Sequence, residues 1–199
     1  MPTPLIVISP EEAGGATRST LLEAAEELKR RGKSVAGVVA PTKDDRRHLI
    51  RISSSETRLL QLNEISEETK EKMKAFKKDM KGEMEFHSDQ EGATSTYGES
   101  TVAVGPFIFD EAVFKWARQE LDESVRVDYL IIDEIGPLEI KRKQGLEPSF
   151  SQALSNLCSP DTSQRVLIVA RKNVWPVLSE LYEVEYTTLQ QVVAASVTK

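Results

Sequence analysis

Two adjacent carboxylates, Asp133 and Glu134, offer the clearest chemistry in the sequence. They follow a continuous apolar run, 129–132, which is typical of a strand buried on both faces of a parallel sheet. Open α/β sheets bind ligands at the carboxyl ends of such strands. An acid there can hold Mg²⁺, and its neighbour can polarise an attacking water. The alternative is a buried strand followed by a solvated acidic turn, and a phosphate-binding loop elsewhere would favour the first interpretation.

The candidate phosphate loop is the stretch SPEEAGGATRST, residues 9–20. A loop of the pattern G-x-x-x-x-G-K-[ST] uses glycines to let backbone N–H groups surround phosphates and a lysine to neutralise them. Aligned on the helix that follows, the chain has Arg18 at the lysine position and Ser19 at the hydroxyl position. The two glycine positions hold Glu12 and Thr17. The motif is therefore degenerate, and an ordinary loop that caps a helix explains it equally well.

Some properties of a phosphate loop survive in this degenerate stretch. Two glycines keep the backbone free, and Arg18 keeps the positive charge, although a guanidinium is bulkier than an ammonium and forked. Glu11 and Glu12 place negative charge beside the anion site, which disfavours phosphate. The residues predicted to contact a nucleotide are Gly14, Gly15, Ala16, Thr17, Arg18, Ser19 and Thr20.

The most basic part of the chain lies in and just before a predicted β-hairpin, residues 48–62. Its arginines are Arg46, Arg47, Arg51 and Arg58. Another arginine, Arg171, directly follows a later apolar run, 166–170. We predict a phosphate clamp formed by Arg46, Arg51, Arg58 and Arg171. A solvated hairpin face is the alternative for each of the hairpin arginines.

The elements that would position these residues alternate between strands and helices. The predicted order is strand 5–8, helix 21–32, strand 35–39, hairpin 48–62, helix 64–82, loop 83–100, helix 111–123, strand 129–132, a helix within 145–157, strand 166–170, helix 174–181, edge strand 184–186 and helix 187–197. Asp110 is the predicted N-cap of helix 111–123, and Gly136-Pro137 breaks the chain before an apolar segment resumes at 138–140. This order predicts an α/β fold with a mostly parallel sheet covered by helices on both faces.

Length and composition limit the classes of protein. The chain has 199 residues, with 39% hydrophobic and 29% charged residues and a formal net charge of −6. We expect one domain over residues 1–199, interrupted at 64–100 by a charged helix and a mobile loop. The acidic balance argues against nucleic-acid and anionic-membrane partners. The lone Cys158 excludes an intramolecular disulfide, and the short apolar run near residue 5 is not a membrane span, so we expect a cytoplasmic protein.

Residues 127–140, VDYLIIDEIGPLEI, resemble the Walker B segment of a family of small P-loop nucleoside-triphosphatases, those related to the thermophile enzyme and to human cancer-related nucleoside-triphosphatase. The matching positions are Asp133, Glu134, Ile135, Gly136, Leu138, Glu139 and Ile140. Residues 104–117, VGPFIFDEAVFKWA, resemble the family's Val-Gly-aromatic segment before a helix, and the arginine-bearing hairpin resembles the family more loosely. The resemblance covers most of the chain outside roughly 64–100.

This resemblance implies a P-loop NTPase-like three-layer fold and Mg²⁺-dependent hydrolysis of a nucleoside triphosphate such as ATP. Asp133 and Ser19 would hold Mg²⁺, Glu134 would be the catalytic base that activates water, and Arg18 would replace the phosphate lysine. Loss of donors to developing charge costs about 10²–10³ in rate, so we expect the degenerate loop to weaken hydrolysis. The alternative is a non-catalytic scaffold or regulatory module that binds a protein partner through residues 64–100.

Overall fold

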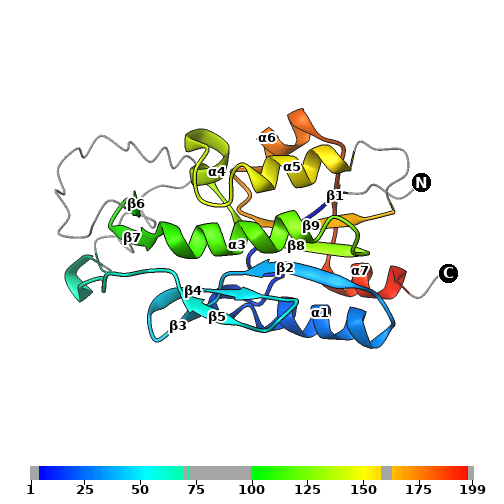
Figure 1. The fold of residues 1–199 in the computed structure, drawn as a ribbon, viewed down its shortest axis with the longest axis horizontal. Helices are drawn as coiled ribbons and strands as arrows, with labels where there is room; N and C mark the ends of the chain where they lie inside the picture. Colours follow the sequence, from blue (N-terminus) through cyan, green and yellow to red (C-terminus); the bar gives the residue numbers. More distant parts are fainter. Residues whose placement is uncertain (1–4, 70, 72–99, 158–162, 197–199) are drawn as a thin grey trace.

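A central sheet of eight strands organises the computed structural model, which describes residues 5–69, 71, 100–157 and 163–196 (Figure 1). The strands within these residues are β1 (Leu5–Ile8), β2 (Val35–Val39), β3 (Thr42–Lys43), β4 (Arg46–Arg51), β5 (Thr57–Leu59), β6 (Thr101–Val104), β7 (Phe107–Asp110), β8 (Tyr129–Ile135), β9 (Arg165–Ala170) and β10 (Val184–Tyr186). The order in the large sheet is β10-β1-β9-β8-β2-β4-β3, with β5 paired to β4, and β6 and β7 form a separate hairpin.

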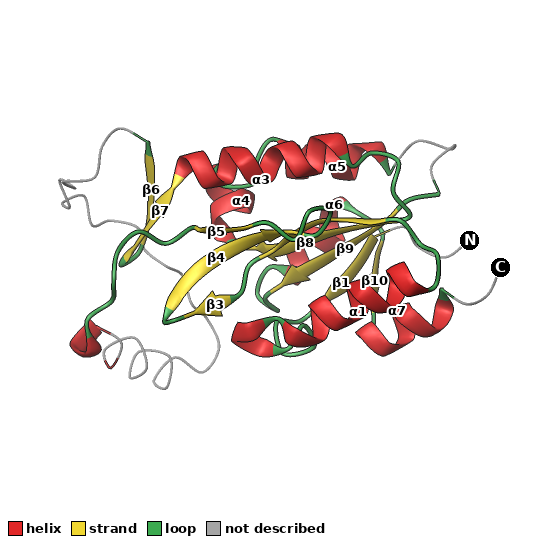
Figure 2. Ribbon diagram, turned by 60° about the horizontal axis from the view of Figure 1, so that its bottom comes forward, coloured by secondary structure: helices red, strands yellow, loops and turns green. Residues whose placement is uncertain are grey.

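The first five strands of this order are parallel, and β4 joins β2 in the antiparallel direction. The helices are the short 3-10 helix η1 (Gly15–Thr17) and α1 (Ser19–Arg30), α3 (Glu111–Glu123), α4 (Pro137–Arg142), α5 (Ser149–Asn156), α6 (Trp175–Leu181) and α7 (Leu189–Ala195). One face of the sheet packs against α3, α4, α5 and α6, and the other against α1 and α7 (Figure 2). The predicted three-layer α/β fold with a mostly parallel sheet is therefore confirmed.

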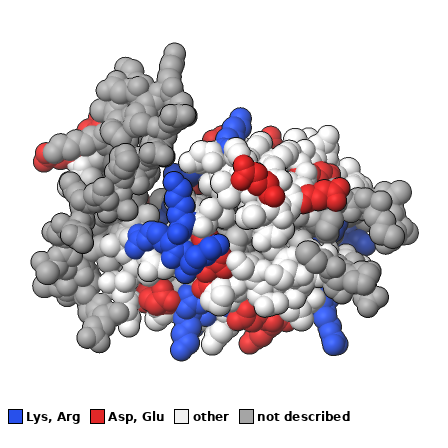
Figure 3. Space-filling model, turned by 90° about the horizontal axis from the view of Figure 1, so that it is seen from above, with Lys and Arg blue, Asp and Glu red and all other residues white. Residues whose placement is uncertain are grey.

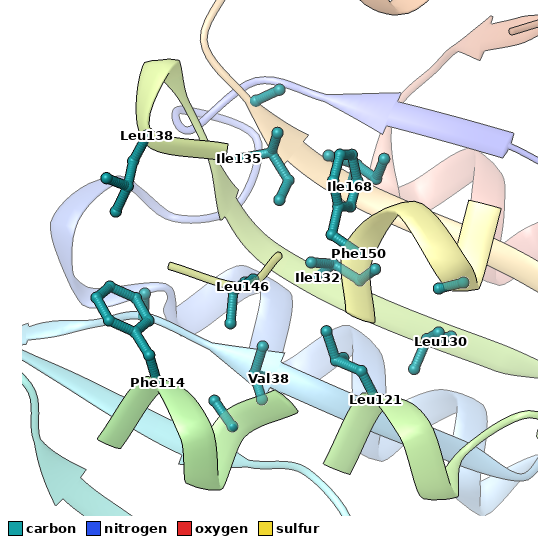
Figure 4. Close-up of a cluster of buried hydrophobic side chains, with 14 of the residues drawn as sticks. Val38, Phe114, Leu121, Leu130, Ile132, Ile135, Leu138, Leu146, Phe150 and Ile168 are labelled. Atoms are coloured by element: carbon teal, nitrogen blue, oxygen red, sulfur yellow. The ribbon is translucent and has the colours of Figure 1, made fainter. Parts of the chain in front are cut away.

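The β8 strand lies inside the sheet, between β9 and β2, and contributes to both cores. Leu130 and Ile132 belong to the core under α3 and α5, whereas Tyr129 and Ile131 belong to the core over α1 and α7. Figure 4 shows Leu130 and Ile132 beside Leu121 of α3. Successive side chains of a strand point to opposite faces, so a strand buried on both faces needs an unbroken apolar run.

The predicted β8 strand ended before the acids, but the observed strand runs on to Ile135. Pairing with β9 continues at Asp133, which lies opposite Val169, and the register shifts between Asp133 and Ile135. Both acids are therefore part of the strand end rather than of a solvated turn. The segment 138–140 that follows is helical, because Pro137 begins α4, where a proline has no N–H to lose.

Local signals placed several other boundaries correctly. The Asp110 side chain accepts a hydrogen bond of 2.8 Å from the Ala112 N–H and caps α3 as predicted. The predicted helix 21–32 is observed as α1, Ser19–Arg30, and Gly32 follows it with a φ of 77°, the left-handed conformation that favours glycine after a helix. Most of the predicted insertion 64–100 lies outside the described residues, so that prediction is untested. None of the described helices is long and apolar enough to span a bilayer.

Candidate functional site

The acids and several arginines meet where the parallel strands end. Arg18 follows β1, Asp133 and Glu134 close β8, and Arg171 follows β9. Arg47 comes from β4, the strand beside β2. The carboxyl ends of parallel strands share one edge of the sheet, which brings residues from distant parts of the chain together. On the face shown in Figure 3, a group of Lys and Arg side chains lies beside acidic ones.

Arg18 contacts both carboxylates. Its side chain is only 2% exposed, and its Nε lies 3.0 Å from Asp133 Oδ1 and 2.8 Å from Oδ2. One terminal nitrogen donates to Glu134 Oε2 at 2.8 Å, and the other donates to the Gly15 carbonyl oxygen. All three guanidinium nitrogens are therefore bound inside the protein. The residue that the resemblance assigns to phosphate neutralises the acids instead.

Asp133 is fully buried, and its carboxylate is held from two sides. In addition to Arg18, the backbone N–H of Ala40 donates to Asp133 Oδ2 at 2.8 Å. Burial raises the pKa of Asp133, and the Arg18 charge and the Ala40 hydrogen bond oppose that rise. The carboxylate thus depends on Arg18 for its charge compensation, because no other cation contacts it among the described residues.

Glu134 is 12% exposed and contacts three guanidinium groups. Arg171 Nε lies 2.7 Å from Oε1, and Arg47 Nη2 lies 3.3 Å from Oε2, the oxygen that Arg18 also contacts. Burial by itself would raise the pKa of Glu134, but the charges of Arg171 and Arg47, with that of Arg18, outweigh it and lower the pKa. A general base works best when its pKa is near the working pH, so this environment makes Glu134 a poor base.

The loop that contains Gly14 and Gly15 packs against the start of α1. At Gly14, with a φ of 93°, an added Cβ would lie 2.7 Å from the Thr20 nitrogen and 2.8 Å from the Ser19 nitrogen. The Thr17 hydroxyl donates to the Gly14 carbonyl oxygen at 3.0 Å, and its oxygen lies 3.3 Å from the Ser19 hydroxyl oxygen. The freedom of glycine is thus used to pack the loop against the helix N-terminus, where a phosphate loop would place its ligand.

The predicted phosphate clamp is not assembled as expected. Arg51 and Arg58 each lie with their guanidinium carbon 4.5 Å from the ring centroid of Trp116, on α3. Arg58 also binds Glu56, and Arg51 also donates to the Trp116 carbonyl. No contact of Arg46 with the acids is present. Of the four predicted arginines, only Arg171 contacts Asp133 or Glu134.

Arg47 contacts Glu134 but was not among the predicted clamp residues. Neighbouring residues of a strand point to opposite faces, so Arg46 and Arg47 cannot both reach Glu134. Arg51 points to the same face as Arg47, but four residues further along the strand, which is about 13 Å. Only the pairing of β4 with β2, in which Val39 lies opposite Ile50, determines which arginine extends past the end of β2. The basic pair Arg46-Arg47 was visible in the sequence, but its register was not.

Glu139, whose role the sequence left open, fixes the segment after the acids. Its side chain is 3% exposed and accepts hydrogen bonds from the Gly136 N–H at 3.2 Å and the Leu146 N–H at 3.3 Å. It therefore caps α4 and ties this helix to the following loop. Burial raises the pKa of Glu139 to about 7, although these backbone hydrogen bonds oppose the rise.

The residues predicted to bind Mg²⁺ do not fit the ion. Both Asp133 oxygens already accept from Arg18, and a second, divalent cation at these oxygens would face the guanidinium charge. The Ser19 side chain is exposed and bonds to Thr17. The oxygens of Asp133 and Ser19 are therefore engaged inside the protein and do not form a free ligand set for Mg²⁺. Two cavities, of about 240 Å³ beside α3 and α5 and about 330 Å³ beside β6 and α4, do not include Arg18, Asp133 or Glu134.

Comparison with known proteins adds one structural likeness. No protein-family model matches the chain, and no curated protein matches it. The chain is similar to the crystal structure of THEP1 from the hyperthermophile Aquifex aeolicus, with 14% identity and a TM-score of 0.48. The match covers 96% of this chain and 94% of that one. A likeness at this level carries no argument about family or function, and the α/β architecture stands on the sheet topology described above.

Proposed function

We propose that this protein is a cytoplasmic, non-hydrolysing protein with an NTPase-like scaffold, which acts as a regulatory binding module. The observation that supports the proposal is the buried contact of Arg18 with both Asp133 and Glu134. In a nucleoside-triphosphatase, separate cations neutralise the phosphates and the acids. Here Arg18 stands at the position of the phosphate lysine and is bound to both acids. It therefore cannot also neutralise the phosphates of a substrate.

Energies also favour this proposal over the weak hydrolase. Removing one partner of a buried ion pair costs about 3–5 kcal/mol, so turning Arg18 away from Asp133 toward a phosphate would cost an amount of that order. A ligand at a hundred times its dissociation constant stabilises its protein by about 2.7 kcal/mol. Nucleotide binding of ordinary strength would not offset the loss. The base is also disfavoured, because arginines surround Glu134 and lower its pKa.

Phosphate release tests the proposal directly. Purified protein is incubated with Mg²⁺ and each of ATP, GTP, CTP and UTP, beside two variants, Glu134→Gln and the exposed control Glu123→Gln. We expect no release above the level of the Glu134→Gln variant. Turnover that both the natural protein and the control show, and that Glu134→Gln abolishes, would establish the hydrolase and contradict the proposal.

The partner of such a module is a separate matter. A protein partner bound through residues 64–100 stays a prediction, because most of that segment lies outside the described residues. The site at the strand ends is fully described, and its charges suggest what kind of small ligand it binds.

A further inference from the structure

The strand-end site holds more positive than negative charge. Arg18 and Asp133 form one neutral buried pair. That leaves the single carboxylate of Glu134 with both Arg47 and Arg171, an excess of one positive charge. A backbone hydrogen bond and the Ser9 side chain lower the pKa of the exposed Glu11, and the charges of Lys172 and Arg18 lower it further. Glu11 and Lys172 together add no net charge, so the excess remains. Two guanidinium groups that share one carboxylate favour a further anion between them.

Arg171 has hydrogen-bond donors to offer to such an anion. Its side chain is 47% exposed, and only its Nε is engaged, with Glu134. Among the described residues, neither of its terminal nitrogens has a hydrogen-bond partner. Arg47 is 27% exposed, and its bond to Glu134 is long at 3.3 Å, while its other terminal nitrogen donates to the Ala40 carbonyl at 3.0 Å. The less exposed Glu134 therefore lies at the base of a small cluster whose rim is formed by the two arginines.

We propose that Arg47 and Arg171 bind a small phosphate-bearing anion without a metal ion. The inference rests on the proposed function, because it requires that Arg18 stays with the acids and that no divalent ion takes its place. Arginine suits the ligand, since its planar fork matches the oxygens of a phosphate group. Because guanidinium donors recognise phosphate oxygens, we expect the phosphates and not the nucleoside to provide most of the binding energy.

This arrangement predicts an effect of Mg²⁺ opposite to that in a nucleoside-triphosphatase. Magnesium bridges phosphate oxygens of a hydrolysed nucleotide and strengthens its binding. In the cluster described here, Mg²⁺ would instead neutralise the polyphosphate and compete with the two arginines. Affinity should therefore fall when Mg²⁺ is added, and it should fall with rising salt because the site is partly exposed.

Calorimetry with inorganic tripolyphosphate tests the inference. The titration is done first with a chelator and then with excess Mg²⁺, and ATP replaces tripolyphosphate in a parallel series. We expect binding in the chelator that weakens with Mg²⁺, and similar affinities for ATP and tripolyphosphate. Arg171→Gln should weaken binding by about tenfold or more, the value of one charge-assisted hydrogen bond. Glu134→Gln should tighten binding, because it removes the competing carboxylate.

A matched control separates the site from general charge attraction. Arg30→Gln changes the net charge equally, but Arg30 is on α1 and pairs with Glu27. Equal losses in Arg30→Gln and Arg171→Gln, an absolute need for Mg²⁺, or no binding at all would each overturn the inference. Binding of ATP alone would overturn it too, since recognition would then involve the nucleoside. Absence of binding without hydrolysis overturns the inference and leaves the proposed function standing, whereas Mg²⁺-dependent hydrolysis overturns the proposed function and the inference with it.

Discussion

Two groups of arginines, at opposite ends of the same strand, serve different purposes. At the strand-end site, Arg47 of β4 joins Arg18 and Arg171 around two carboxylates. At the other end of β4, Arg51 lies with Arg58 over Trp116. The first group is held mainly by buried charges. The second is held by an aromatic ring, by one bond from Arg51 to the Trp116 carbonyl and by the exposed pair of Arg58 with Glu56. The same residue type therefore contributes a buried ion pair in one place and a packing contact in the other.

The two groups differ in burial, and therefore in whether removing an arginine leaves a buried charge without a partner. Arg18 and Asp133 are 2% and 0% exposed, so solvent would not stabilise either charge if its partner were removed. Arg58 is 45% exposed and remains solvated in any case. Buried ion pairs are costly to break, whereas exposed pairs contribute little. Substitutions in the two groups should therefore differ strongly in their effect on stability.

Arg18→Ala should have the largest effect. Asp133 would remain buried without its cation, and we expect a loss of about 3–5 kcal/mol in the free energy of unfolding at neutral pH. Urea unfolding followed by far-UV circular dichroism measures it. The double variant Arg18→Ala/Asp133→Asn should recover part of the loss, because it removes the unpaired charge. A loss in Arg18→Ala no larger than that in Arg58→Ala would show that the strand-end pair is not the stabilising contact described here.

Glu139 is a carboxyl near the strand-end site that has backbone partners but no arginine. Its pKa in the folded protein is about 7, above the ordinary 4.5. Between these two values the folded protein binds the additional proton, so the free energy of unfolding falls as pH rises from 4.5 to 7. The contribution is about 3 kcal/mol, from the size of the shift. Urea unfolding at pH 5 and pH 8 measures it.

The variant Glu139→Gln isolates this contribution. It cannot ionise, so its stability should change less between pH 5 and pH 8 than that of the natural protein. The exposed control Glu123→Gln should keep the natural pH dependence. If Glu139→Gln and the natural protein show the same change, Glu139 is not the group that titrates in this range.

Arg58→Ala should have the smallest effect. A cation over an aromatic ring at an exposed position contributes about 0.5–1 kcal/mol, and the exposed pair with Glu56 adds little. Thermal unfolding should show a correspondingly small decrease in the melting temperature, and anion binding at the strand-end site should be unchanged. A loss of tripolyphosphate binding in this variant would restore the hairpin clamp that the sequence predicted.

Much of the fold could be predicted because its signals are local. The apolar run 129–132 marked a buried strand, and Asp110 marked the start of α3, since both patterns depend only on neighbouring residues. The site was predicted in part for the same reason. A strand ending in two acids and a loop carrying Arg18 were visible, and their meeting at one sheet edge follows from parallel topology. The choice of Arg47 over Arg46 was not predictable, because it depends on strand register.

The sequence by itself determined that acids and arginines stand at strand ends, and that the phosphate loop lacks its glycines and lysine. Only the tertiary structure decided what Arg18 does. Its contact with Asp133 joins residues 115 positions apart, and no local pattern records such a pair. The physical reason is burial, because a guanidinium away from solvent must pair with the carboxylates beside it. Arg18, which the sequence predicts as a phosphate ligand, therefore neutralises the acids instead.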